Sequence, residues 1–242
     1  MSLNIIKADW PAPSNVVAFT TTRQGGFSQA PFDSFNLAQH VDDLTSVVAR
    51  NRQLLVSQFN LPSEPVWLDQ VHSTKVLEIG SSATALQPAD GLITASPKVV
   101  CAVMTADCMP LFLSDQAGTK VAVVHAGWRG MADGIIEQAV GLFNQPPEQI
   151  LAWAGPTIGP KYFEIGPEVK EQLMGPKEAY TASSNKGKLL ADLYLLAGQR
   201  LAGLGVLNYT HAAYCSYADQ QLFYSYRRSK VTGRMASIIY LT

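Results

Sequence analysis

Apolar and polar residues follow two different periods along this chain, which predict a protein of mixed helices and strands. Three segments carry apolar residues at the roughly 3.6-residue spacing of a helix that is buried on one side. These predicted helices are Leu44–Phe59, Met131–Phe143 and Leu189–Leu204. Pro62 follows the first helix and Pro146-Pro147 ends the second, as expected where a helix stops.

Short runs of apolar and β-branched residues predict strands, most of them in the middle of the chain. They are Val16–Thr21, Val66–Leu68, Lys75–Ile79, Leu92–Thr94, Val99–Met104, Leu111–Ser114, Lys120–His125, Ile150–Ala154, Val206–Thr210 and Ser237–Leu241. Asp115-Gln116-Ala117-Gly118 supplies the turn residues of a hairpin. The polar segment Met174–Lys188 is expected to be a mobile surface loop. Because the sequence shows no repeat or linker, the simplest interpretation is one α+β domain over residues 1–242.

The net charge, the number of cysteines and the lengths of the apolar stretches argue against several classes of function. A net charge of -1 gives no general attraction to nucleic acid or to an anionic membrane, so partners of either kind are not expected. Three cysteines, an odd number, do not suggest a disulfide framework. No stretch approaches the roughly 20 apolar residues that span a bilayer, and the N-terminus does not resemble a signal peptide. We therefore expect a cytoplasmic protein, and its oligomeric state stays open.

His72, Cys108 and His125 each stand where a predicted strand breaks into a turn. Strand ends commonly present reactive side chains to a cleft. Two imidazoles and one thiolate also make the three-ligand set of an open, catalytic zinc site. The long separations between the three residues lack the signature of a zinc finger, and free cysteines are commonly small core residues. Core packing is the better explanation for Cys101 and Cys215. From the residues alone, two interpretations stay open: a metal site, or two structural histidines and a core cysteine.

Two aspartates and several cations are further candidates. Asp90 and Asp107 either orient an imidazole or act as a general acid, and the alternative for each is a turn cap. Arg129 precedes the predicted second helix, where a guanidinium and backbone N–H groups suggest an anion pocket. Arg23 and Arg52 are additional basic candidates, although each alone fits a surface residue equally well. The basic run 226–230, followed by Arg234, is interpreted as a solvated face.

A series of motifs in a fixed order identifies a family resemblance. The two most specific are Thr105-Ala106-Asp107-Cys108-Met109-Pro110 and His125-Ala126-Gly127-Trp128-Arg129-Gly130. The others lie at residues 21–28, 34–40, 51–52, 69–72, 89–92, 155–160 and 223–228. Over essentially its whole length the chain resembles the bacterial YfiH-type, laccase-domain or polyphenol oxidase family, usually described as purine nucleoside phosphorylases.

This resemblance implies a fold, a metal site and an activity. The implied fold is a mixed β-sandwich flanked by helices. The implied metal ligands fall on His72, Cys108 and His125, with zinc as the expected ion and copper as the alternative. The implied reactions are phosphorolysis of adenosine, inosine and methylthioadenosine, and deamination of adenosine. The partners would then be a nucleoside and phosphate. Arg52 and Arg129 are the candidates for holding phosphate, Arg23 is a weaker one, and Asp90 or Asp107 would carry a proton.

Rival functions remain open from the sequence. Cys108 could be a nucleophile and His125 or His72 its base in a metal-free hydrolase. Amide hydrolysis that edits peptidoglycan precursors would suit either a metal or a thiolate. A copper oxidase with several metals needs many histidines, and this chain has four. A scaffold with a structural zinc would need a fourth protein ligand, for which His40 is the one plausible histidine.

Overall fold

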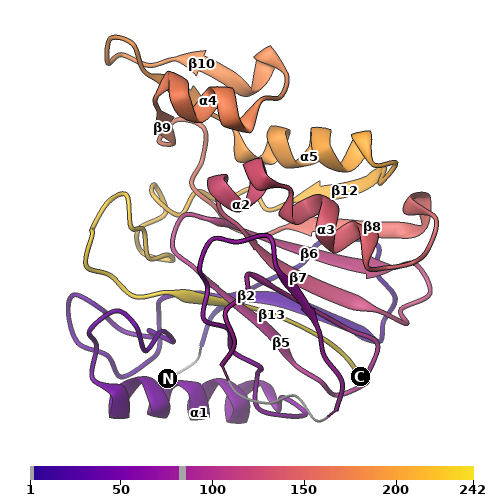
Figure 1. The fold of residues 1–242 in the computed structure, drawn as a ribbon. Helices are drawn as coiled ribbons and strands as arrows, with labels where there is room; N and C mark the ends of the chain where they lie inside the picture. The colour runs from indigo at the N-terminus through magenta and orange to yellow at the C-terminus, as the bar shows by residue number, and fades with distance from the viewer. Residues whose placement is uncertain (1–2, 82–85) are drawn as a thin grey trace.

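Two β-sheets packed face to face form the centre of the protein, and helices cover both outer faces (Figure 1). The computed structural model describes residues 3–81 and 86–242. The first sheet has the order β1 (Ile5–Lys7), β2 (Val16–Thr21), β13 (Met235–Leu241) and β5 (Cys101–Thr105), and all of its pairs are antiparallel.

The second sheet contains six strands and is mixed. Its order is β12 (Asn208–His211), β8 (Ile150–Ala154), β6 (Met109–Asp115), β7 (Val121–Ala126), β4 (Gly91–Thr94) and β3 (Val76–Glu78). The two outermost pairs are parallel and the inner pairs are antiparallel. The architecture confirms the expected mixed β-sandwich flanked by helices.

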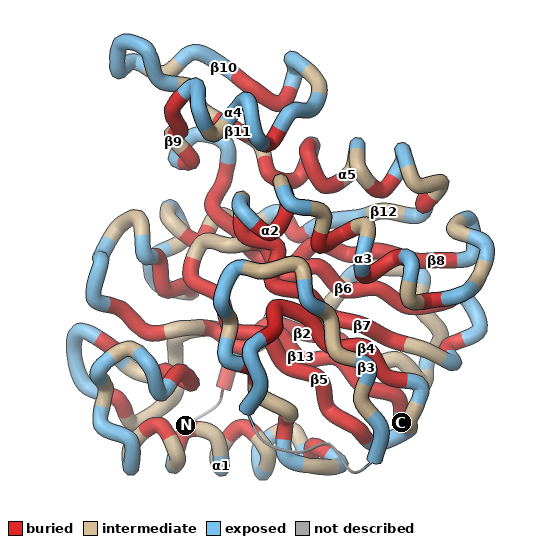
Figure 2. Tube along the Cα trace, viewed as in Figure 1, coloured by how far each residue is buried: buried red, intermediate tan, exposed pale blue. Residues whose placement is uncertain are grey.

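The alternation of side chains along the strands produces the layers. On β5, Cys101 and Val103 face the second sheet, where they join Phe112, Val123 and Trp153 in one buried cluster. This position confirms the expectation of core packing for Cys101. Residues one step along the strands face outward instead, because successive side chains of a strand point to opposite faces. Figure 2 shows the inner strands of both sheets as the buried interior of the molecule.

The outer faces are covered by helices from distant parts of the chain. α1 (Thr45–Phe59) packs Leu55 against Phe19 and Ile238 of the first sheet. α3 (Ile135–Gly141) and α5 (Leu193–Gly203) cover the second sheet. No helix among residues 3–81 and 86–242 is long and apolar enough to cross a membrane.

The second predicted helix is interrupted in the structure. α2 (Trp128–Asp133) ends and α3 begins at Gly134, whose φ of 102° lies in the left-handed region where a glycine is unstrained. The apolar spacing of Met131–Phe143 continues through the break and therefore concealed it. The predicted hairpin that joins Leu111–Ser114 to Lys120–His125 is confirmed, since β6 pairs with β7 and Gly118 supplies the positive φ of the turn.

A small upper lobe was not predicted. It consists of β9 (Glu164–Ile165), α4 (Pro167–Leu173), the 3₁₀ turn η2 (Lys177–Ala179), β10 (Tyr180–Ala182) and β11 (Leu189–Ala191). Its three strands form a separate sheet above α5 (Figure 1). The interpretation of Met174–Lys188 as a loop without structure was therefore wrong. Strands this short carry too few residues to show a period.

Two predicted elements differ most from the structure. The segment Leu189–Leu204 begins as β11, and the helix starts only after Asp192, whose carboxylate accepts the N–H groups of Tyr194 and Leu195. Val66–Leu68 is not a strand. It contributes one isolated bridge, from Val66 to Cys101.

Candidate metal centre and its cavity

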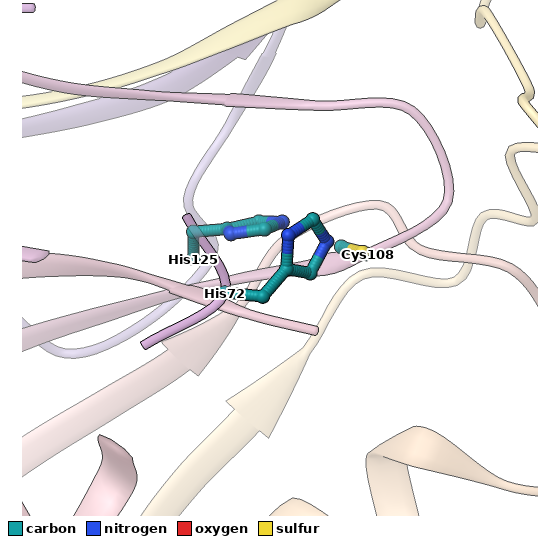
Figure 3. A group of neighbouring side chains, drawn as sticks. All are labelled: His72, Cys108 and His125. Atoms are coloured by element: carbon teal, nitrogen blue, oxygen red, sulfur yellow. The ribbon is translucent and has the colours of Figure 1, made fainter. Parts of the chain in front are cut away.

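Three side chains from separate segments meet at one end of the sandwich. The ligand atoms of His72, Cys108 and His125 all lie within 4.8 Å of one another (Figure 3). The two imidazole rings stand edge to face, with their centroids 4.8 Å apart. His125 is buried, Cys108 is half-buried and His72 is exposed, so the group opens toward solvent on one side. The structure thus brings together the trio that the sequence singled out.

Strand pairing explains why the three residues converge. His125 lies on β7 opposite Pro110 of β6, and Cys108 directly precedes β6. His72 comes from the loop before β3 and has a φ of 60°. The residue before the cysteine, Asp107, has a φ of 94°. Non-glycine residues with positive φ carry backbone strain and often cluster at functional sites.

Asp90 connects two members of the trio. Its Oδ1 lies 2.8 Å from Nδ1 of His125, and the same oxygen accepts the backbone N–H of His72 at 3.0 Å. Its Oδ2 accepts both the N–H and the hydroxyl of Ser73. Because Nδ1 of His125 is engaged by Asp90, Nε2 is the nitrogen left for a metal. Asp90 therefore contacts an imidazole and also caps the turn that carries His72, which are two of the three roles that the sequence left open.

The trio holds a thiolate at neutral pH. Burial alone would raise the pKa of the Cys108 thiol, but His125 and His72 beside it lower that pKa to about 6. Burial alone would lower the pKa of His125, and the Cys108 thiolate and Asp90 raise it instead, to about 9. Metals bind the thiolate form of cysteine and the neutral form of histidine, so zinc would bind the Cys108 thiolate directly and displace the proton of His125.

The space between the three ligands is kept free by Gly127. A Cβ at this position would lie 3.0 Å from Sγ of Cys108 and 3.2 Å from Cδ2 of His72. Two imidazole nitrogens and one thiolate match the soft and borderline donors that Zn²⁺ prefers. Within the part of the chain that the structure describes, the group consists of these three side chains. His40 does not join it, which fits an open site better than a closed structural one.

A cavity of about 730 Å³ adjoins the trio. Its apolar part includes Trp128, Phe163, Ile165 and Leu193, which come from α2, from the upper lobe and from the start of α5. This volume lies in the range of small-molecule sites, which combine apolar walls with a few polar groups. The upper lobe therefore completes the cavity that the sandwich begins.

The structure separates the other sequence candidates. Asp107 and Arg129 line the cavity, and the Arg129 guanidinium lies 4.4 Å from the centroid of the Trp128 ring. Arg52 does not line it. Its Nε donates to the carbonyl of Leu37, and Cζ of its guanidinium lies 4.0 Å from the centroid of the Trp67 ring.

Arg23 also lies away from the cavity. It donates to the carbonyl and the carboxylate of Asp33 and stacks over Tyr224. Arg23 and Arg52 are thus not among the residues that line the cavity, because local sequence does not show which side chains an arginine will meet. For Cys215 the expectation was packing in the core. The residue is instead half-buried, and its Sγ accepts the N–H of Gly159.

Sequence reasoning missed the cavity's basic wall. Arg227, Lys230 and Arg234, interpreted above as part of a solvated face, line the cavity together with His40 and Gln70. Arg227, Lys230 and Arg234 belong to the long loop between β12 and β13, gold to yellow in Figure 1. The local density of positive charge was the available signal. The position of this basic wall depends on the pairing of β13 with β5, two strands whose paired residues lie about 130 positions apart in the chain.

The fold and the trio together define a class: an α+β sandwich protein with an open group of two histidines and one cysteine that can bind a metal. Residues 17–242 match the family described as multi-copper polyphenol oxidoreductase laccase, and the chain belongs to this family. The family resemblance inferred from the motifs is thereby confirmed.

Several known proteins are similar to this chain over nearly its full length. "Purine nucleoside phosphorylase YfiH" of Escherichia coli (strain K12) is 47% identical over 239 residues, covering 98% of both chains. "Purine nucleoside phosphorylase PA4543" of Pseudomonas aeruginosa is 46% identical, covering 96% of both. The crystal structure of Neisseria meningitidis protein NMB0706 superposes with a TM-score of 0.91 at 41% identity, covering 98% of this chain and 99% of that one.

Proposed function

We propose that this protein is a zinc-dependent purine nucleoside phosphorylase that also deaminates adenosine. The observation that carries the proposal is the open His72, Cys108 and His125 group at the end of a cavity that has both aromatic and cationic walls. The names of the relatives from E. coli and P. aeruginosa support the phosphorylase activity. The expected substrates are adenosine, inosine and methylthioadenosine, with phosphate as co-substrate.

His72, Cys108 and His125 would hold the zinc, and Asp90 would keep His125 and the backbone of His72 in position. When bound, zinc supplies a Lewis acid with an open coordination position. Trp128 and Phe163 offer aromatic faces to a purine. These residues bind and orient, while the buried Asp90 carboxylate is fully occupied by its donors.

We assign Asp107 a positioning role rather than a proton-carrying one. Its two carboxylate oxygens accept the Ser216 hydroxyl and the backbone N–H of Arg227, both at 2.6 Å. These bonds attach the loop between β12 and β13 to the turn that carries Cys108. Cys108 accordingly acts as a metal ligand in this proposal, and Arg129 is the sequence candidate for phosphate that the cavity retains.

Product analysis tests the proposal directly. Zinc-loaded protein is incubated with adenosine, with and without phosphate, and the products are separated by chromatography. We expect adenine and ribose 1-phosphate only when phosphate is present, and inosine when it is absent. The absence of turnover in both conditions would reject the nucleoside activity and make peptidoglycan precursors the next substrates to test.

One observation favours a second candidate, a metal-free cysteine hydrolase. Asp90, His125 and Cys108 form a chain of contacts in which a carboxylate orients an imidazole beside a thiolate. This is the arrangement of a nucleophile, its base and an orienting group. Turnover that survives removal of metal by a chelator, and that a thiol alkylator then abolishes, would identify the cysteine as the nucleophile. Loss of turnover on chelation alone would support the metal enzyme.

A copper polyphenol oxidase is the weaker alternative, despite the family's description. A cluster of several coppers requires many histidines, and the whole chain has four. Metal analysis of the purified protein separates zinc from copper.

A further inference from the structure

Three of the cations that line the cavity form no ion pair within the described part of the chain. Arg129, Lys230 and Arg234 all reach its wall. Among the residues that the structure describes, the ion pairs formed involve none of these three side chains. Carboxylates also line the cavity, but none lies within ion-pair distance of these cations. Positively charged side chains without an ion-pair partner in a concave wall can attract an anionic ligand.

The guanidinium of Arg234 is held in place by one of its edges. Its Nη1 donates to the carbonyls of Thr232 and Gly233, at 2.8 and 3.0 Å, and its backbone N–H donates to Oδ1 of Asn36. Within the described ranges, Nε and Nη2 have no hydrogen-bond partner. These two donors share the edge of the guanidinium that binds an oxyanion with two parallel hydrogen bonds. Arg234 is therefore preorganised for such a ligand.

Strand register places this edge beside the metal centre. Met235 of β13 pairs with Thr105 of β5. Arg234 directly precedes Met235, at the end of this ladder, and Thr105 stands three residues before Cys108. Burial lowers the pKa of Arg234, and the nearby charges of Cys108 and Asp107 oppose that effect. An anion bound by Arg234 would thus lie next to a substrate that contacts the metal.

Lys230 supplies a second, more mobile cation on the same loop. Its side chain is exposed, and Nζ lies 4.6 Å from the centroid of the Tyr226 ring. Arg227 differs from these two cations, because its guanidinium donates to the carbonyl of Tyr162 and lies near Phe163. The free charges of the basic wall are accordingly Arg234, which is rigid, and Lys230, which can adjust to the ligand.

We propose that inorganic phosphate binds against the Nε–Nη2 edge of Arg234 and the ammonium group of Lys230. The identity of the anion rests on the phosphorylase function proposed above. In that reaction a phosphate oxygen forms a bond to C1′ of the ribose while the C1′–N9 bond breaks. The electron pair stays on N9, and the proton of HPO₄²⁻ ends on the purine, so the products are ribose 1-phosphate and the free base. Arg234 and Lys230 offset the charge of the dianion and orient the attacking oxygen.

Two variants with a matched control test the phosphate site. Arg234→Lys keeps the charge but removes the two-donor edge, and Lys230→Ala removes an exposed cation that does not support the fold. Lys186→Ala is the control, because Lys186 is exposed and lies in the turn of the upper lobe, outside the cavity lining. With zinc-loaded protein and adenosine, each test variant should raise the KM for phosphate at least about tenfold. The control should keep the wild-type KM.

A binding measurement without turnover separates this site from the proposed function. Broadening of the ³¹P signal of inorganic phosphate should occur with wild-type protein and disappear with Arg234→Lys and Lys230→Ala. Phosphate binding by the wild type without phosphorolysis would reject the function and keep the site. Phosphorolysis in which both variants retain the wild-type KM and ³¹P broadening would overturn the site and keep the function.

Discussion

Asp90 and His125 form a buried pair in which Oδ1 of the carboxylate lies 2.8 Å from Nδ1 of the imidazole. The carboxylate side chain is fully buried and the imidazole is 5% exposed, so water does not compete for this hydrogen bond. The same carboxylate holds the backbone of His72. One residue therefore positions two of the three candidate metal ligands.

Replacing this carboxylate should weaken metal binding. An Asp90→Asn variant keeps the volume but loses the charge that supports the His125 ring and the loop of His72. Loss of such an outer partner typically lowers metal affinity by about 10–100-fold. Competition with a chromophoric chelator measures the affinity. Asp115→Asn, a change at another buried and multiply bonded carboxylate, is the control and should bind zinc as tightly as the wild type.

Removing the thiolate should abolish both bound metal and activity. Cys108→Ala leaves two histidines, too few to retain zinc in an open site. Zinc per protein after gel filtration and turnover of adenosine are the two measurements. Cys215→Ala removes another half-buried sulfur that lies outside the trio, and it should keep the metal. A Cys108→Ala protein with zinc and full turnover would disprove the ligand assignment.

A single methyl group at Gly127 should disturb the site. The Cβ of Gly127→Ala would lie 3.0 Å from Sγ of Cys108, closer than side chains normally pack. We expect weaker zinc binding and lower activity with little change in the fold. Gly141→Ala is the matched control: it meets nothing within 4 Å at the end of α3, and it should stabilise the protein by about 0.5–1 kcal/mol in thermal or urea unfolding. Equal zinc affinity in the two variants would contradict the assigned role of Gly127.

Arg129 and Arg52 should behave differently when replaced by alanine. Arg129 lines the cavity, whereas Arg52 donates to the Leu37 carbonyl and lies over the ring of Trp67. Arg129→Ala should reduce phosphate use more than deamination. Arg52→Ala should instead lower the midpoint of thermal unfolding. The two assays and a melting curve for each variant distinguish these effects, and a phosphate defect confined to Arg52→Ala would reverse the assignment.

The stability of the fold should depend on pH through Asp115. Burial alone would raise the pKa of this carboxyl, but hydrogen bonds from Thr119, Lys120 and Gln145 outweigh it and lower the pKa. Because the folded pKa lies below the unfolded one, the carboxylate contributes its full stability above about pH 4 and loses it as the pH falls through the folded pKa. Asp115→Asn should cost about 2 kcal/mol of unfolding free energy at pH 7. That difference from the wild type should shrink toward pH 3 in urea titrations.

Local sequence patterns were sufficient for most strands of the sandwich, for α1 and for the trio, whereas the three-residue β1 was not predicted. Short continuous apolar runs such as that of β7 are buried on both faces of their strand, so they stand out in the sequence itself. His72, Cys108 and His125 could be selected because each follows such a run. The family motifs then indicated that the three residues belong to one site.

Long-range pairing determined the rest. The break at Gly134 depends on the left-handed conformation of one residue inside a continuous apolar spacing, and the strands of the upper lobe are too short to show a period. Arg234, which the sequence placed on a solvated face, lines the cavity because β13 pairs with β5, while Arg52, a candidate for phosphate, donates to the Leu37 carbonyl. A charged side chain carries the same local signal on an open surface and in a cavity, and only the contacts made by the folded chain distinguish the two.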